Sequence, residues 1–382
     1  DEIEKVYIRS SELKISDELL HYSVWGHDRK DQHVMLASQQ YHRESAPDFE
    51  ATRFVHQSLP QLKVEDVDYS TSIAGLDLQA PFFINAMTGG TEETGRINRI
   101  LGILGYLAKI PVASGSVSAA IKDPAVAETF SVIRRENPKG IVFANLGAHH
   151  DLENAKRAVD LLEANALQIH VNAPQEILMP EGDRDFSNWL TNIETLVREM
   201  EVPVIVKEVG FGMSRETVKQ LASVGVKTVD ISGTGGTDFA KIEDNRRAYD
   251  RYPYMHGWGQ STVISLAEAM SLSEEERPEI IASGGIKNPL DIIKSLSMGA
   301  KLVGMSNHFL QLARNDKGIE DALMNIRIME EQTKRVMSML GAKNLTELQQ
   351  KDLILAPAVQ NWCQARGIDW QVYANRSQKA GF

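Results

Sequence analysis

From residue 81 onward, the chain alternates between short apolar runs and longer segments in which apolar residues have helical spacing. In 96–109, for example, apolar side chains recur three and four positions apart and would form one face of a helix. The apolar runs between such segments have the length and β-branched content of buried strands. We therefore predict eight strands, at 82–87, 110–114, 140–145, 166–172, 202–208, 228–232, 279–283 and 302–306.

Several helix ends are also predicted from local sequence. Asn288-Pro289 and Asp123-Pro124 are typical of a capping residue followed by proline in the first turn. Gly299 is expected to end the helix that Asn288 begins, because glycine commonly follows a helix C-terminus. Ser187 is expected to cap the helix that comes after it.

Eight strand–helix units predict an α/β fold, a (β/α)₈ TIM barrel. A doubly wound open sheet stays open as an alternative, because alternation alone does not show that the sheet closes. We expect 1–382 to form a single domain, with an N-terminal extension at 1–80, the barrel at 81–312 and C-terminal helices and a tail at 313–382.

Two segments interrupt this regular alternation. The long interval between the sixth and seventh strands leaves 235–258 as a predicted lid over the barrel mouth, carrying Phe239 and Glu243 together with Arg246-Arg247. After the eighth strand, 319–340 predicts a further amphipathic helix.

Glycines follow the predicted strands at the end where barrel enzymes carry their chemistry. The clearest example is 228–239, where three glycines lie among hydroxyl residues. Such a loop lets the backbone approach a phosphate or a flat ring closely, although a simple tight turn is the alternative. Ser283-Gly284-Gly285-Ile286 and Gly304-Met305 follow strands seven and eight, where barrels commonly bind phosphate.

Polar residues on the fourth and fifth predicted strands are the main candidates for chemistry. Gln168, His170 and Asn172 share one face by the two-residue period of a strand, which we expect to be the barrel interior. A structural histidine is the alternative for His170. The carboxylate in Gln175-Glu176 suits Mg²⁺.

Lys207 ends an otherwise apolar strand, where a cation is costly unless it is paired. If a flavin lay above it, Lys207 would stabilise negative charge at the N1/O2 edge of the ring.

Composition limits the possible partners. The net charge of −11 argues against nucleic acid or an anionic membrane as a general partner, so an anionic substrate needs a local basic cluster. Arg29-Lys30-Asp31-Gln32-His33 is a candidate, with a solvated charge run as the alternative. The single cysteine, Cys363, and the absence of a long apolar run lead us to expect a cytoplasmic protein.

These residues resemble the type 2 isopentenyl diphosphate isomerases, an FMN-dependent family of isoprenoid synthesis. The resemblance covers nearly the whole chain, and a paired Arg-Lys and a Gln-Glu element set it apart from the 2-hydroxy-acid oxidases. One departure is Phe239, where some members have tryptophan. The motifs that carry the resemblance are Arg29-Lys30-Asp31-Gln32-His33, Asn85-Ala86-Met87-Thr88-Gly89-Gly90, His170-Val171-Asn172-Ala173-Pro174-Gln175-Glu176, Lys207-Glu208-Val209-Gly210 and Ser232-Gly233-Thr234-Gly235-Gly236-Thr237.

The resemblance implies a role for each matching position. Catalytic roles fall to Gln175, His170 and Lys207, and Glu176 would bind Mg²⁺. The implied substrate contacts are Arg29, Lys30, His33, His170, Asn172 and Gln175. The implied FMN contacts are Ala86, Met87, Thr88, Ser116, Asn145, Lys207, Ser232, Thr237, Gly284, Gly285, Ile286, Gly304 and Met305.

The implied reaction converts isopentenyl diphosphate to dimethylallyl diphosphate by a 1,3-allylic proton shift without net redox. Reduced FMN would act as acid and base, NADPH or NADH would reduce it, and Mg²⁺ would bind the diphosphate. The family further suggests a homotetramer or homo-octamer. Two alternatives remain: a phosphate-binding scaffold without catalysis, and an FMN-dependent 2-hydroxy-acid oxidoreductase. The latter needs a histidine–arginine pair late in the barrel, whereas His308 has no arginine in the adjoining glycine turn.

Overall fold

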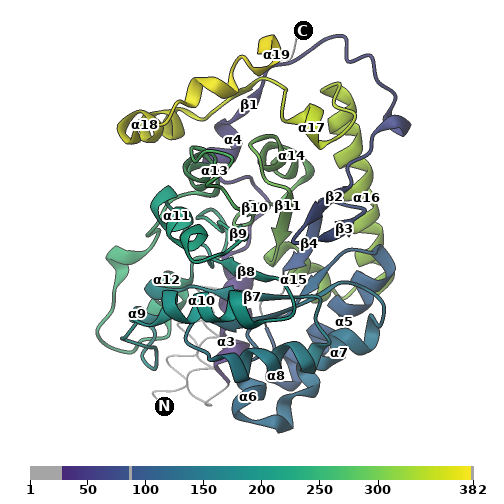
Figure 1. Ribbon diagram of the computed structural model, residues 1–382. Coiled ribbons are helices and arrows are strands. Elements are labelled where there is room, and N and C mark those ends of the chain that lie inside the picture. Colours follow the sequence, from purple (N-terminus) through teal and green to yellow (C-terminus); the bar gives the residue numbers. More distant parts are fainter. Residues whose placement is uncertain (1–27, 86–87, 380–382) are drawn as a thin grey trace, which may run out of the picture.

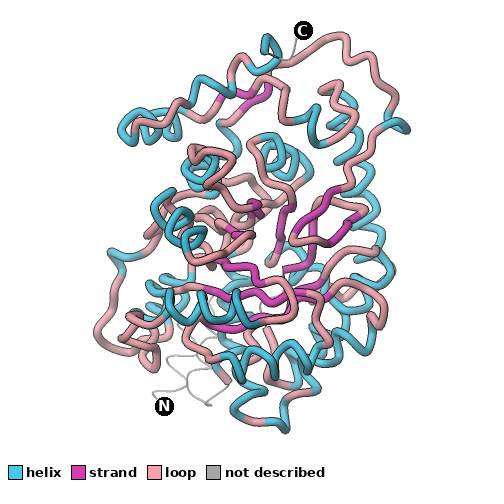
Figure 2. The backbone as a smooth tube through the Cα atoms, viewed as in Figure 1, coloured by secondary structure: helices cyan, strands magenta, loops and turns pink. Residues whose placement is uncertain are grey.

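The computed structural model describes residues 28–85 and 88–379. Eight parallel strands form a closed barrel, in which the last strand pairs with the first through Val303 and Phe82. Figure 2 shows these strands at the centre of the molecule, with helices around them. Closure rules out the open-sheet alternative and confirms the TIM-barrel prediction. The strands are β4 (Phe82–Asn85), β5 (Val112–Ala113), β6 (Val142–Gly147), β7 (Ala166–His170), β8 (Val204–Lys207), β9 (Thr228–Asp230), β10 (Glu279–Ala282) and β11 (Leu302–Met305).

All eight predicted strands are present, each within the predicted range or two residues beyond it. The helices between and after them carry apolar faces that pack against the outside of the barrel. The longer ones are α5 (Glu92–Ala108), α7 (Glu128–Glu136), α8 (Leu152–Leu162), α10 (Trp189–Glu199), α11 (Arg215–Ser223), α13 (Thr262–Met270), α14 (Pro289–Ser297) and α16 (Gly318–Met339). The shorter ones are α6 (Ser118–Lys122), α9 (Ala173–Leu178), α12 (Phe239–Asn245) and α15 (Asn307–Ala313), with 3₁₀ turns η2 (Pro124–Val126) and η3 (Pro253–Met255).

The interior of the barrel has two layers. Buried side chains from seven strands form one apolar cluster, which includes Phe143, Ile205 and Ile281 and which also takes in Ile73 and Leu78. The last two belong to a hairpin of β2 (Thr71–Ile73) and β3 (Leu76–Leu78), which therefore covers the lower end of the barrel. Two residues further along the strands, the same inward face turns polar. This polar layer, the barrel floor, consists of Asn85, Asn145, Gln168, Lys207, Asp230 and Ser283.

Local capping was predicted correctly at one helix and wrongly at another. Asn288 caps α14 by accepting the Asp291 N–H at 2.9 Å, and Gly299 follows the helix with a φ of +123°. Asp123 caps only the 3₁₀ turn η2. The prediction for Ser187 was wrong: α10 begins after Asn188, because the hydroxyl and N–H of Ser187 both bond the Asp185 carboxylate, at 2.6 and 2.9 Å.

The N-terminal extension and the C-terminal tail meet outside the barrel. Arg53 of β1 (Arg53–Phe54) pairs antiparallel with Ile354 of β12 (Leu353–Ile354). Figure 1 shows this sheet at one end of the molecule, beyond α13 and α14, while α3 lies at the other end. The remaining elements are α3 (Arg29–Gln40), α4 (Pro47–Ala51), η1 (Val64–Asp66), α17 (Leu345–Leu348), α18 (Pro357–Arg366), η4 (Trp370–Tyr373) and α19 (Arg376–Lys379).

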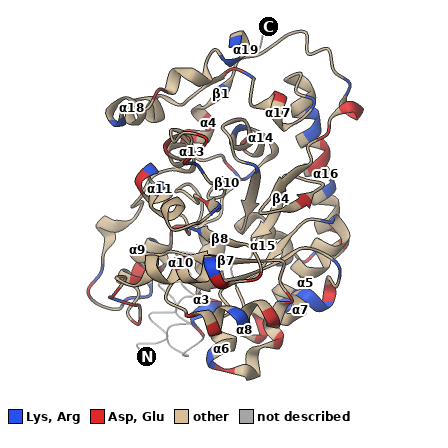
Figure 3. Ribbon diagram, viewed as in Figure 1, with Lys and Arg blue, Asp and Glu red and all other residues tan. Residues whose placement is uncertain are grey.

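Charged residues of both signs are interspersed over the face drawn in Figure 3. Among the helices of the described ranges, none combines the length and the apolar character that a bilayer crossing requires.

Candidate active site

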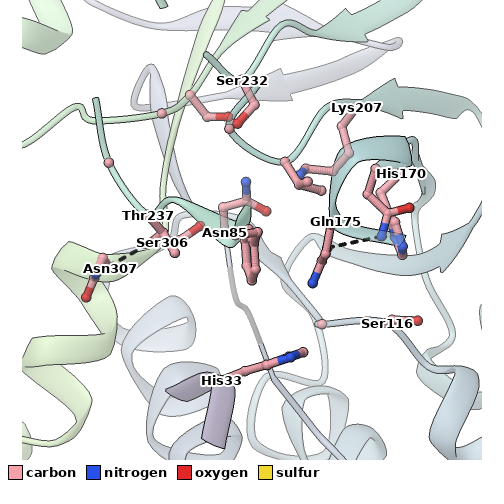
Figure 4. A pocket seen from close by; sticks show the side chains of 18 of the residues that line it. His33, Asn85, Ser116, His170, Gln175, Lys207, Ser232, Thr237, Ser306 and Asn307 are labelled. Carbon is pink, nitrogen blue, oxygen red and sulfur yellow. Dashed lines mark hydrogen bonds between the residues drawn. The ribbon is translucent and has the colours of Figure 1, made fainter. Parts of the chain in front are cut away.

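A cavity of about 260 Å³ opens at the C-terminal ends of the barrel strands. Figure 4 shows Lys207, His170 and Gln175 on one side of it, Ser232 and Thr237 on another, and His33 across from them on α3. The predicted site residues that line it are Arg29, Lys30, His33, Ser116, Asn145, His170, Asn172, Gln175, Glu176, Lys207, Ser232, Thr237, Gly284, Gly285, Ile286, Gly304 and Met305.

Three predicted FMN contacts are not among these residues. Ala86 and Met87 lie outside the described residues. Thr88 is buried and does not line the cavity; its carbonyl accepts the Gly115 N–H at 3.2 Å and the Asn98 amide at 3.2 Å.

A hydrogen-bonded chain of three residues crosses the barrel floor. The Asn145 amide nitrogen donates to Gln168 Oε1 at 3.1 Å, and Asn145 Oδ1 lies 2.8 Å from His170 Nδ1. Burial, followed by the charges of Lys207 and Lys30, lowers the pKa of His170 well below its usual value. His170 is therefore neutral at pH 7, and its Nδ1–H donates to Asn145.

Lys207 is the cation of the barrel floor. Its side chain is 7% exposed, and its ammonium donates to the Glu208 carbonyl at 2.7 Å. Burial lowers the pKa of Lys207, while the carboxylates of Asp230 and Glu208 act in the opposite direction. An ammonium has three donors, so two remain for a ligand in the cavity.

The segment after β7 turns directly into α9, which begins after Asn172 and fixes three side chains together. The Asn172 amide donates to Gln175 Oε1 at 3.0 Å and to Glu176 Oε1 at 3.1 Å. The other Glu176 oxygen accepts the Asp183 N–H at 2.8 Å. No group of three or more acidic, histidine or cysteine side chains suited to a metal occurs among the described residues. A cation at Glu176 would therefore need ligands from a substrate, as Mg²⁺ commonly takes from phosphates.

The glycine loops after β9 and β10 pack backbone against backbone at the cavity wall. A Cβ on Gly236 would lie 2.7 Å from the Gly285 nitrogen, and one on Gly284 would collide with the Gly233 carbonyl. Gly284 and Gly285 also have φ of +98° and +71°, which other residues rarely adopt. These loops, with the N-terminus of α14 just beyond, form the kind of backbone cradle that holds a phosphate.

The cavity is covered by two helices, α3 and α12, here called the helical cover. His33 Nε2 lies 2.8 Å from Glu243 Oε1, which also accepts the Gln175 amide at 3.0 Å. Arg246 contacts the other Glu243 oxygen and donates to Gln32 at 3.0 Å. Burial would raise the pKa of Glu243, but the neighbouring His33 ring and Arg246 guanidinium outweigh it and hold this pKa at about 2.

Other contacts fasten the helical cover in place. The Gln40 side chain donates to the Asp238 carbonyl at 3.2 Å and accepts the Asp238 N–H at 2.7 Å. The ring of Phe239 meets His33 edge-on, with 6.1 Å between the ring centres. The predicted lid 235–258 therefore supplies part of the cover, since Phe239 lines the cavity.

Arg29 and Lys30 project from the first turn of α3 into the cavity wall. Arg29 lies 3.3 Å from the Met179 sulfur and 3.8 Å from Glu181, so its guanidinium is held at the rim. Burial and then the charge of Arg29 lower the pKa of Lys30 to about 8. Two cations on one turn form a strong anion site.

Sequence reasoning missed several lining residues: Asn85, Ser118, Lys122, His149, Lys287 and Asn307. Strand parity would have found Asn85, which lies two residues beyond inward-facing Phe83 on β4. Lys122 ends the short helix α6 after β5, and His149 lies in the turn after β6; at neither place does a local period mark a side chain as functional.

Comparisons with known proteins fit this geometry. Residues 136–355 match the family of FMN-dependent dehydrogenases. The isopentenyl-diphosphate delta-isomerase of Latilactobacillus sakei subsp. sakei (strain 23K) is 48% identical over 340 residues, covering 89% of this chain and 96% of that protein. The isopentenyl-diphosphate delta-isomerase of Streptomyces sp. (strain CL190) is 45% identical over 350 residues, covering 91% and 95%.

Solved structures show the same fold at lower identity. A flavocytochrome b2 mutant has a TM-score of 0.63 at 21% identity, covering 86% of this chain and 84% of that one. A mandelate oxidase mutant with a monooxide FMN adduct has a TM-score of 0.58 at 14% identity, covering 93% and 100%. These likenesses concern the barrel fold alone.

Proposed function

The chain belongs to the isopentenyl-diphosphate delta-isomerase family, and its barrel to the FMN-dependent dehydrogenases; from this premise we propose that it converts isopentenyl diphosphate to dimethylallyl diphosphate at the cavity above the barrel floor. The reaction moves one double bond by adding a proton at one carbon and removing one from another. A protein doing this must hold the diphosphate away from the reacting carbons and must exclude water from them.

The observation that carries the proposal is the position of α3. Arg29 and Lys30 line the same cavity as Lys207 and the glycine loops, although α3 precedes the first barrel strand in sequence. Two separate anion sites in one cavity suit a cofactor phosphate on the loops and a substrate diphosphate on α3.

The residues present fit FMN. The loops at Gly236 and Gly284-Gly285 admit only glycine and lie where barrels hold phosphate, and Lys207 lines the same cavity. When bound, reduced FMN supplies the acid/base chemistry of the proton shift, without net redox. Lys207 would then hold the N1/O2 edge of the ring with the two N–H donors that its bond to the Glu208 carbonyl leaves.

The side chains on the β7 side hold the substrate. His170 is neutral and fixed by Asn145, so it positions without adding charge next to the reacting carbons. Gln175 accepts a hydrogen bond from Asn172 and donates one to Glu243, so its amide has a fixed orientation at the cavity wall. We assign His170, Gln175 and Lys207 as catalytic residues because each is both fixed and exposed to the cavity.

We further propose that Mg²⁺ joins Glu176 to the substrate diphosphate, since hard cations combine one or two carboxylates with phosphate oxygens. NADPH, or NADH, would reduce the flavin. The whole chain would act as a single FMN-binding domain within a homotetramer or homo-octamer. The net charge of −11 fits a protein without nucleic-acid or membrane partners.

A 2-hydroxy-acid oxidoreductase is the competing function for this fold. It needs an arginine beside a histidine late in the barrel, because a guanidinium can hold both oxygens of the substrate carboxylate. Among the described residues that line the cavity, the only arginine is Arg29, on α3. The cavity therefore favours a diphosphate on the cover over a carboxylate at the late strands.

The test is to incubate the FMN-loaded, NADPH-reduced protein with isopentenyl diphosphate and Mg²⁺ in D₂O without oxygen, and to follow it by ¹H NMR. We expect the methylene signals to give way to those of dimethylallyl diphosphate, with deuterium incorporated and no net consumption of NADPH. Turnover of a 2-hydroxy acid with stoichiometric flavin reduction, and none of the diphosphate, would overturn the proposal. A purified protein that binds no flavin would favour a scaffold.

A further inference from the structure

Asp230 is a buried carboxylate in the barrel floor that does not line the cavity. It lies on β9, is 0% exposed, and stands beside Lys207 of β8 and Ile281 of β10 in the strand register. Its Oδ1 accepts the Ser283 hydroxyl at 2.7 Å and the Ser232 N–H at 3.1 Å. Its Oδ2 has no hydrogen-bond partner among the described residues.

A carboxylate this deep needs a counter-charge, because burying an unpaired charge costs several kcal/mol. Lys207 is the only Lys or Arg within strands β4–β11, all of which the structure describes. It is also the register partner of Asp230, and paired residues on parallel strands point to the same face. The only other acid in these strands, Glu279, contacts Lys301 at 2.8 Å near the opposite end of the barrel.

Three titratable groups face Lys207, and they differ in what holds their charge. His170 on β7 is neutral, as described above. Burial raises the pKa of Glu208, next along β8, to about 8, so this carboxyl is mostly protonated at pH 7. Burial also raises the pKa of Asp230, but Lys207 and the two hydrogen bonds to Oδ1 oppose this. Asp230 is thus the acid that the strand register places beside Lys207 in the floor.

We propose that Asp230 is a positioning residue for the FMN site: it keeps Lys207 charged and directed at the cavity without touching the cofactor itself. The inference rests on the proposed function for the place of Lys207 against the flavin N1/O2 edge. Its consequence is that a floor residue that does not itself line the cavity controls the ionisation of the bound, reduced flavin.

Two possible roles for Asp230 predict opposite changes in the pKa of N1 of reduced FMN when Asp230 is replaced. If Asp230 keeps Lys207 protonated, its loss turns Lys207 neutral, and the N1 proton of reduced FMN is then held more tightly. If Asp230 only offsets a lysine that is charged anyway, its loss strengthens the positive field, and that proton is held less tightly. The direction of the change in the N1 pKa therefore separates the two.

The experiment titrates reduced, protein-bound FMN by absorbance from about pH 5 to 9 in wild type, Asp230→Asn, Lys207→Met and the double variant. We expect Asp230→Asn to raise the pH at which the anionic reduced flavin becomes neutral by about one unit or more. Adding Asp230→Asn to Lys207→Met should change nothing further. An unchanged or lowered transition in Asp230→Asn would overturn the inference.

Two further measurements keep the inference testable. Ser283→Ala removes one bond to Asp230 without removing its charge, so it should raise the transition by less; it replaces Asp230→Asn if that variant does not fold. If Lys207→Met leaves the flavin titration unchanged, the proposed place of Lys207 is wrong. In that case the ¹³Cε signal of Lys207 in the FMN-free protein decides: its pKa should fall by about one unit or more in Asp230→Asn, and an equal pKa rejects the role of Asp230.

Discussion

The barrel floor and the helical cover enclose the same cavity but are held together in different ways. Floor residues such as Asn145 and Gln168 come from adjacent strands, and their positions follow from the strand period and register. The cover is joined by side chains distant in sequence: Arg246 donates to Gln32, which lies 214 positions before it. The floor is therefore part of the barrel itself, whereas the cover consists of two helices that pack through apolar residues such as Met35 and Ile242 and are joined by polar contacts between distant segments.

This difference predicts different effects of mutation. Floor residues cannot move without disturbing the barrel, so changes there should alter the cofactor and its electronic state. Cover residues can separate locally, so changes there should alter substrate capture and the local stability of α3 and α12. Each prediction below tests one side of this division.

The largest effect is expected from replacing both Arg29 and Lys30 by alanine, on the cover. Each charge-assisted contact to a diphosphate is worth roughly 1.5–3 kcal/mol. We expect kcat/KM for isopentenyl diphosphate to fall by about two orders of magnitude or more, with FMN content and Tm nearly unchanged. Steady-state kinetics, flavin absorbance and thermal denaturation measure these three quantities.

The matched control is Arg99→Ala, since Arg99 forms an exposed ion pair with Glu136 away from the cavity. It should leave kcat/KM unaffected. Wild-type kinetics in the double variant would mean that the residues of α3 are a solvated charge run, and the assignment of the substrate site would fail.

The next effect concerns Glu243→Gln, which removes the charge at the centre of the cover. The folded pKa of about 2 lies below an ordinary value of 4.5, so ionised Glu243 stabilises the native state above about pH 4.5. This stabilisation, about 3 kcal/mol, is lost as the pH falls from 4.5 toward 2. We expect the protection factors of the α12 amides, which take out the pH dependence of unprotected exchange, to fall steeply over this range in wild type.

In Glu243→Gln the protection factors of these amides should already be low at pH 7 and should change little on acidification. Burial also lowers the pKa of His33, and protonation of this ring below its usual titration range would weaken the cover in the same direction. Equal exchange in the two proteins at pH 7 would show that the cover does not depend on this carboxylate.

The same division explains which features were predictable from sequence. The eight strands and the inward stripe of Gln168 and His170 follow from periods of two, which one strand displays by itself. The same reasoning could have found Asn85. The contact of His33 with Glu243 could not be predicted, because it depends on how two segments meet after the barrel has closed.

A local signal also failed where a capping side chain had a second hydrogen-bond partner nearby. Ser187 has the composition of a helix cap, but the Asp185 carboxylate two residues earlier binds its hydroxyl and N–H. The glycine loops were predicted as ligand sites from composition. Their need for glycine becomes clear only in three dimensions, where the backbone of Gly285 approaches Gly236.

On the floor, Lys207→Ala removes the cation offered to the flavin. We expect the FMN dissociation constant to rise about ten- to a hundredfold and the reduction potential to fall, because a contact to a charged group is worth roughly 1.5–3 kcal/mol. Ile205→Val on the same strand is the control for packing, and it should alter Tm without altering the potential. Unchanged affinity and potential in Lys207→Ala would place this ammonium away from the N1/O2 edge.

The smallest effect is expected where floor and cover meet, at Glu176. Glutamine can keep the bond from Asn172 but loses the charge, and its amide nitrogen cannot accept the Asp183 N–H. Because Mg²⁺ binds carboxylate far better than amide oxygen, the Mg²⁺ concentration for half-maximal activity should rise by about tenfold. The FMN spectrum should stay intact, since no floor residue changes.

Glu181→Gln, which also alters an acid of the cavity wall but leaves Glu176 in place, is the matched control and should leave the Mg²⁺ titration unchanged. If Glu181→Gln shifts the titration and Glu176→Gln does not, the cation lies at the rim beside Arg29, and the cover alone holds the diphosphate.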